Sequence, residues 1–161
     1  MRRFLFISAI ILICFLVEII LSTNFYFLRI RPNLLLLAVI FFTVYMGLIE
    51  GLFSAAIAGL LKDAFNLSFS AMNLLVFTIC VLVINYLKKY IYRETFQTIF
   101  LTTIVIYFLN IFLDYLIGYS GRVSFLGVSF LFVCLIEIIL NGLLAPFVFF
   151  YLKRCALKFY V

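Results

Sequence analysis

The sequence has 161 residues, of which 69% are hydrophobic and 11% charged, and its formal net charge is +6. A soluble domain carries roughly 25% charged residues, so this composition excludes a water-soluble fold and predicts an integral membrane protein. The chain has no histidine, and its four cysteines share no metal-ligand spacing. We therefore expect no metal, no cofactor and no nucleic-acid partner. Long apolar runs without ten-residue alternation predict an all-α bundle and exclude a transmembrane barrel.

Four stretches are apolar enough to cross a hydrocarbon core of about 30 Å as single helices. They cover residues 4–21, 71–87, 98–117 and 127–151. The first begins like a signal peptide, but it is long and lacks a small-x-small cleavage site, which predicts an uncleaved span.

Residues 33–61 are harder to interpret because one helix of that length is too long for an upright span, and two helices broken at "GLIEG" are each too short. The positions of the basic residues separate the two arrangements. A hairpin gives six passes and places both termini on one side with eight bases, against four on the other side. The eight are Arg2, Arg3, Lys88, Lys89, Arg93, Lys153, Arg154 and Lys158. We therefore predict about six transmembrane helices in one domain over 1–161, with a short helical hairpin at 33–63 and cytoplasmic termini.

Glu50 lies between Gly47 and Gly51, at the predicted turn of this hairpin. We expect a turn acid that reaches water or lipid headgroups, with flanking glycines that permit the turn. A proton or ion carrier is the alternative.

The second arm of the hairpin carries small residues at every fourth position. These are Gly51, Ala55 and Gly59, and Asp63 continues the row. Small residues at this spacing let helices approach closely in lipid. We therefore expect the hairpin to be the tightly packed centre of the bundle, with Asp63 in contact with Lys62, Asn66 or a partner.

Several polar residues fall inside the predicted spans. Glu137 lies near the middle of the last span, with Asn141 one turn on. Asn110 and Asp114 repeat that spacing in the preceding span. We expect a structural hydrogen-bond network between these two helices, with a proton path as the alternative. Glu18 lies near the outer end of the first span, where we expect it to reach the interface.

Four motifs follow one another along the chain. They are "RPN" (Arg31, Pro32, Asn33), "AGLLKD" (Gly59, Asp63), the basic linker "YLKKYIYRE", and "NGLLAP" (Asn141, Gly142, Pro146) before a short basic tail. Pro32 opens a predicted helix, and Pro146 is expected to kink the last span. In this order the motifs resemble the MreD family of bacterial rod shape-determining membrane proteins, over nearly the whole chain. Glu137 is not one of the family's motif positions.

The resemblance implies a non-enzymatic scaffold of cell elongation and peptidoglycan synthesis in the bacterial inner membrane. Such a scaffold binds MreC through lateral helix contacts and lies with MreB, RodZ, RodA and a class B penicillin-binding protein. The resemblance also implies a fold like that of the substrate-binding subunits of energy-coupling-factor vitamin transporters, and such a subunit is the alternative function. It would need a polar pocket near the outer leaflet, for which Asn24, Asn66 and Arg122 are the candidates. A membrane enzyme would need a cluster of nucleophiles, acids or metal ligands, and the sequence shows none.

Overall fold

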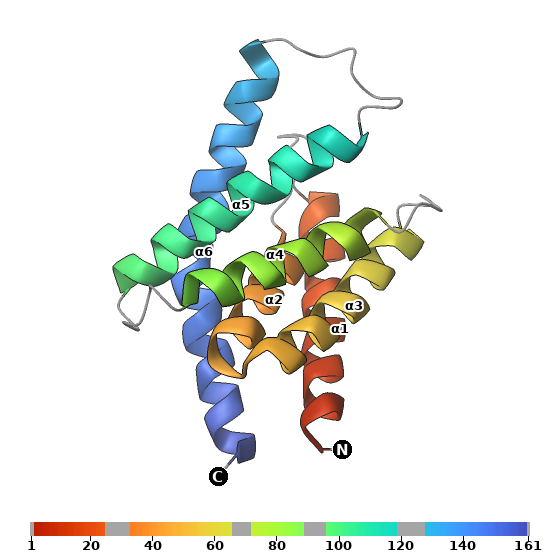
Figure 1. The fold of residues 1–161 in the computed structure, drawn as a ribbon, viewed down its shortest axis with the longest axis vertical. Coiled ribbons are helices and arrows are strands. Elements are labelled where there is room, and N and C mark those ends of the chain that lie inside the picture. The colour runs from red at the N-terminus through yellow and green to blue at the C-terminus, as the bar shows by residue number, and fades with distance from the viewer. Residues whose placement is uncertain (1, 25–32, 66–71, 89–95, 119–127, 161) are drawn as a thin grey trace.

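The computed structural model describes residues 2–24, 33–65, 72–88, 96–118 and 128–160 (Figure 1). These residues form six α-helices and no strand, which confirms the predicted all-helical class. The helices are α1 (Arg2–Asn24), α2 (Leu34–Tyr45), α3 (Leu48–Phe65), α4 (Met72–Lys88), α5 (Phe96–Gly118) and α6 (Val128–Tyr160).

The predicted hairpin is present as α2 and α3, and the chain turns at Met46 and Gly47. Gly47 has a φ of +119°, which glycine adopts without the steric cost of a Cβ atom. Its N–H donates to the carbonyl of Phe42 at 3.2 Å, and its carbonyl accepts from Gly51 at 3.0 Å. The expectation that Gly47 and Gly51 both flank the turn is half right, because Gly51 lies inside α3. Glu50 lies in the first turn of α3, where the helix dipole favours a carboxylate.

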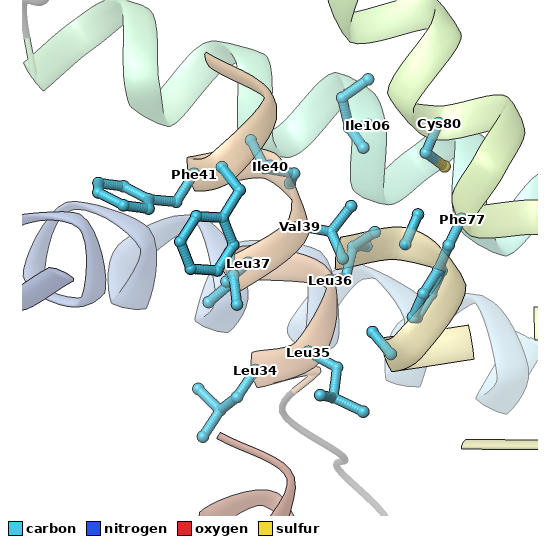
Figure 2. Packing of buried hydrophobic residues seen from close by; sticks show 14 of the residues in the cluster. Leu34, Leu35, Leu36, Leu37, Val39, Ile40, Phe41, Phe77, Cys80 and Ile106 are labelled. Carbon is cyan, nitrogen blue, oxygen red and sulfur yellow. The ribbon is translucent and has the colours of Figure 1, made fainter. Parts of the chain in front are cut away.

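The hairpin lies at the centre of the bundle, as expected, and α2 is its more deeply buried arm. All ten residues from Leu34 to Thr43 are buried, because α2 packs against α1, α3, α4 and α6. A helix that is apolar on every side is stable only when it is surrounded. Figure 2 shows its side chains among those of α4 and α5, including Phe77, Cys80 and Ile106. At 12 residues, α2 is about 18 Å long, and the surrounding helices cover all of it except its last two residues, which are half-buried.

Both termini lie at one end of the molecule, where α1 begins and α6 ends (Figure 1). Ring contacts show that α1 and α3 run in the same direction, since Phe4 lies 4.7 Å from Phe53 and Phe15 lies 5.5 Å from Phe65. The turn between α2 and α3 lies near the same end, because the Lys153 Nζ of α6 is 5.3 Å from the centre of the Tyr45 ring.

Within the described residues, α1 and α6 each contain a segment long and apolar enough to cross a membrane, at Arg3–Leu21 and Leu135–Ala156. Three shorter apolar helices accompany them. The last helix is longer than predicted, since α6 has 33 residues, includes Pro146, and ends at Tyr160 instead of 151. The predicted basic tail is therefore the final part of α6.

Candidate functional site

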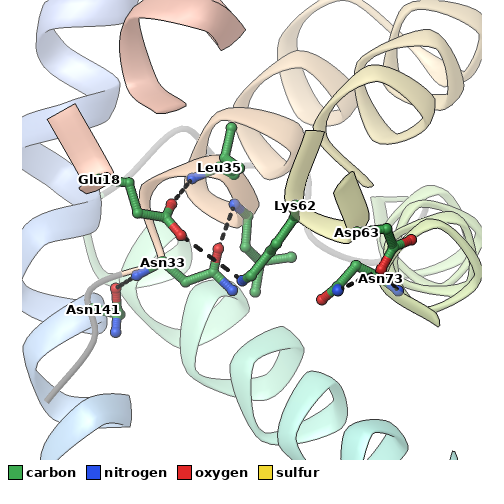
Figure 3. Close-up of polar contacts among 8 residues, drawn as sticks. Glu18, Asn33, Leu35, Lys62, Asp63, Asn73 and Asn141 are labelled. Carbon is green, nitrogen blue, oxygen red and sulfur yellow. Dashed lines mark hydrogen bonds and ion pairs between the residues drawn. The ribbon is translucent and has the colours of Figure 1, made fainter. Parts of the chain in front are cut away.

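The first turn of α2 begins inside the bundle, where its free N–H groups have no access to bulk water. Three side chains satisfy the backbone there (Figure 3). The Asn33 Oδ1 accepts from the Leu36 N–H at 3.1 Å, as a helix cap does. The Glu18 Oε2 of α1 accepts from the Leu35 N–H at 3.0 Å. The Asn141 Oδ1 of α6 accepts from the Asn33 N–H at 3.0 Å.

The Glu18 carboxylate forms an ion pair with the Lys62 ammonium. Lys62 of α3 places its Nζ 3.9 Å from the Glu18 Oε1, and the two side chains are 22% and 14% exposed. The same Nζ lies 5.4 Å from the centre of the Phe77 ring. The position of Glu18 at the membrane interface stays a prediction, and its carboxylate accepts from the first turn of α2 while remaining partly exposed.

A second buried helix start is capped by Asp63, at the end of the small-residue row. Its Oδ1 accepts from the backbone N–H of Asn73 at 3.0 Å and from the Asn73 Nδ2 at 2.6 Å. Its Oδ2 accepts from the Leu74 N–H at 3.1 Å. Asp63 therefore joins α3 to α4. The expected partner Lys62 is engaged by Glu18 instead, and Asn66 lies outside the described residues.

The small-residue face of α3 is buried along its length. The buried residues are Gly51, Ser54, Ala55, Ala58, Gly59 and Asp63. A Cβ atom at Gly59 would lie 2.5 Å from the Cα of Leu74, and one at Gly51 would lie 2.5 Å from the Thr43 Oγ1. The face thus packs against α2 at one end and against α4 at the other, and the predicted close approach is present.

The "NGLLAP" motif of α6 contacts the start of α2 through Asn141 and contacts α5 through Gly142. Asn141 is fully buried, and its Nδ2 donates to the Glu137 carbonyl at 2.8 Å. A Cβ atom at Gly142 would lie 3.1 Å from the Phe100 ring of α5. Pro146 and Glu137 are half-buried.

The polar network that we predicted between the last two spans is only partly described. Asn141 connects α6 to α2, a partner that we had not predicted. Asn110 is buried in α5, and the side chain of Asp114 lies outside the described residues. Arg31 and Pro32 also lie outside them.

The arrangement organises the backbone and offers no obvious reaction chemistry. Within the described ranges, no group of three or more His, Cys, Asp or Glu could hold a metal ion. Sequence reasoning missed the capping role of Glu18 and missed Asn73 as the hydrogen-bond partner of Asp63. For Glu18 a signal existed, because an acid in an apolar span needs a partner. For Asn73 there was none.

Comparison with known proteins agrees with the motifs. The family described as rod shape-determining protein MreD matches residues 1–155 of the chain. No curated protein and no solved structure matches the chain. The family match includes every motif from Arg31 to Pro146.

Proposed function

The chain belongs to the MreD family of rod shape-determining membrane proteins, and on that premise we propose that it is a scaffold of the bacterial cell-elongation machinery. The family implies a role in rod shape determination and is not known as an enzyme family. In our proposal the chain binds MreC directly through lateral helix contacts. MreB, RodZ, RodA and a class B penicillin-binding protein belong to the wider complex, which directs peptidoglycan synthesis.

The observation that carries the proposal is how the bundle uses its polar side chains. Glu18, Asn33, Asp63 and Asn141 are all engaged with backbone N–H groups. Carboxylates engaged in this way hold helices in place and are not free to act as nucleophiles or carriers. The outward faces of α1 and α6 carry large apolar side chains instead, such as Leu12 and Leu143, at 52% and 54% exposure. Faces of this kind suit contact with lipid and with a partner's membrane helix.

We assign the motif residues to maintaining that shape. Asn33, Asp63 and Asn141 cap helices, and the rest allow close packing or local bends. These others are Arg31, Pro32, Gly51, Ala55, Gly59, Gly142 and Pro146, with Glu137 as an addition outside the family motifs. The whole of 1–161 then forms one transmembrane domain.

The proposed topology has six passes in the bacterial inner membrane, with both termini in the cytoplasm. It is supported by the shared end of the two termini in Figure 1 and by the eight bases assigned to that side. The shortness of α2 is compatible with a pass because the surrounding protein, and not lipid, covers it.

Site-specific photo-crosslinking in native membranes tests the partner. A photoreactive residue is placed at Leu12 on α1, at Leu143 on α6 and at Leu60 on α3, which are all exposed. We expect a crosslink to MreC from at least one of these faces and not from all three, because a lateral contact uses one face. Recovery of the tagged chain without MreC, and with no crosslink from any face, would contradict the scaffold.

The transporter alternative remains a prediction from sequence. The side chains of Asn24, Asn66 and Arg122 lie outside the described residues, so no structural observation favours a substrate pocket. Its test is part of the same purification, since an energy-coupling-factor subunit would bring an ATPase module with it.

A further inference from the structure

The C-terminal part of α6 carries an exposed apolar stripe that leads to a base. Leu143, Phe147 and Phe150 follow one another at spacings of four and three residues, which places them on one face, and Tyr151 lies at the edge of that face. Their exposures are 54%, 66%, 64% and 66%. Arg154, three residues after Tyr151, is exposed at the end of this face. From Leu143 to Arg154 the stripe is about 16 Å long, and we call it the α6 stripe.

The guanidinium of Arg154 is available to a ligand. It makes no hydrogen bond or ion pair with the residues that the structure describes. A guanidinium presents paired N–H donors that match two phosphate oxygens. Lys153, the preceding residue, is held near the helix by its contact with the Tyr45 ring, which itself lies 6.2 Å from the Phe149 ring. Lys153 therefore adds a positive charge at the same level of the helix, with its side chain directed towards α2.

The charge of the chain is concentrated on this side of the proposed topology. The side with the termini has eight bases and two acids, Glu50 and Glu94, and therefore carries the whole net charge of +6. The other side and the spans have four bases and four acids. An excess of bases next to a bilayer attracts anionic lipid headgroups.

We propose that the α6 stripe binds an anionic phospholipid of the cytoplasmic leaflet. The acyl chains lie along Leu143, Phe147 and Phe150, and the phosphate meets Arg154, with the charge of Lys153 at the same level of the helix. A phospholipid fits better than an acidic protein segment, because the stripe joins an apolar face of acyl-chain dimensions to one unpaired guanidinium. The proposal rests on the proposed topology but not on the binding of MreC.

The absence of tryptophan from the chain makes a direct test possible. Tyr151→Trp places a single indole on the stripe beside Arg154. The full chain is reconstituted in phosphatidylcholine vesicles containing either brominated phosphatidylglycerol or brominated phosphatidylcholine, and quenching of the indole is measured. We expect phosphatidylglycerol to be preferred at this position by about three- to tenfold at low salt, and less at high salt.

Two controls show whether the preference belongs to the stripe. Leu135→Trp places the indole at the other end of the same helix, on a residue that is also exposed, and should show no preference. In the Tyr151→Trp background, Arg154→Gln together with Lys153→Gln should abolish the preference. Arg154→Lys should retain part of it, because the charge remains while the paired donors are lost.

Equal quenching by the two lipids at Tyr151→Trp would overturn the proposal and leave an acidic protein segment as the ligand of Arg154. A preference that survives the double substitution would overturn it too, and so would an equal preference at Leu135→Trp. Each variant is first checked for monodisperse folding by gel filtration, and Arg154→Lys provides a second reading if the double variant is unstable. The vesicles contain no MreC, and MreC contact can be read from Leu12 and Leu60, which lie outside the α6 stripe, so the two proposals fail separately.

Discussion

Asp63 is the polar residue whose loss should cost the bundle most. Its two oxygens accept from two backbone N–H groups and from one amide, and the side chain is only 7% exposed. Asp63→Ala leaves the first N–H groups of α4 unpaired, which costs about 1–3 kcal/mol for each buried group. We expect a large drop in the midpoint of thermal unfolding in detergent. Asp63→Asn should be intermediate, because its amide replaces one acceptor with a donor.

Glu50→Gln is the matched control for Asp63. Glu50 is also an acid of α3, but it lies half-buried in the first turn, beside the hairpin bend. A glutamine still reaches water there, so folding and the complementation of a cell-shape defect should both be preserved. Rounded cells with Glu50→Gln at normal protein level, together with full activity of Asp63→Asn, would contradict the scaffold mechanism and the assigned role of Asp63.

Substitutions at Glu18 and Lys62 distinguish the stability that Glu18 contributes as a helix cap from the stability that it contributes as a partner in an ion pair. Its N–O distance is 3.9 Å and both side chains are partly exposed, so the ion pair itself should contribute little. The hydrogen bond from Leu35 to Glu18 satisfies an N–H that has no other acceptor in its helix. We therefore expect Glu18→Ala to lower the stability of the bundle more than Lys62→Met does. It should also lower it more than Glu18→Gln, because glutamine retains an acceptor for the Leu35 N–H.

A double-mutant cycle with Glu18→Gln and Lys62→Met measures the charge pairing alone. A coupling energy below about 1 kcal/mol is expected for a partly exposed pair. A coupling energy as large as the whole loss of stability in Glu18→Ala would contradict this. It would show that Glu18 stabilises the start of α2 through the ion pair and not through the hydrogen bond to Leu35.

At the level of helices, the glycines predict a graded series of alanine variants. A Cβ atom at Gly59 would meet the backbone of Leu74 at 2.5 Å, and backbone cannot move aside without separating α3 from α4. At Gly142 it would meet side chains and no backbone, namely the Phe100 ring at 3.1 Å and the Ile104 Cγ1 at 3.2 Å, which can shift. We expect Gly59→Ala to destabilise by about 1–3 kcal/mol, as overpacking does, and Gly142→Ala by less. Thermal unfolding of the purified variants gives the order.

Leu60→Ala serves as the control for Gly59, because Leu60 is next in sequence but 56% exposed. It removes apolar surface that faces outward and should be mild. If Gly59→Leu and Leu60→Ala were tolerated equally, the small-residue face would not lie at the α3–α4 contact.

The sequence predicted the helices better than their environment. The small-residue row indicated the buried face of α3, because close approach depends on residue size alone. It predicted the hairpin as the centre but could not show that α2 is its more buried arm, since an apolar helix in lipid and one in a protein core have the same composition. Nor could spacing along the chain find the contact between Asn33 and Asn141, which are 108 residues apart. That contact exists only when α6 packs beside α2.

For the whole molecule, the cap of α2 connects the two ends of the chain. Glu18 belongs to the first helix and Asn141 to the last, and both accept from the backbone at the start of α2. The first and last membrane helices are therefore held on either side of one short central helix. A scaffold requires this, because its outer faces must keep a fixed spacing for a partner to recognise.

The same arrangement makes the membrane topology testable. The bend at Gly47 lies near the end that carries both termini, because Phe4 contacts Phe53 and Lys153 contacts Tyr45. In a background where the native cysteines are replaced by alanine, Ile49→Cys is the reporter, since Ile49 is 70% exposed.

We expect an impermeant maleimide to label Ile49→Cys and Tyr92→Cys only after the cells are opened, as it should label a cysteine restored at 155. Arg122→Cys should be labelled in intact cells, because six passes place it on the outer side. The charge distribution gives the physical reason, since a basic linker is retained in the cytoplasm. Labelling of Tyr92→Cys from outside would show that the chain crosses the membrane an odd number of times before the linker. Residues 33–61 would then cross the membrane once and would not return to the outer side, and the shared end of the two termini would not correspond to one side of the membrane.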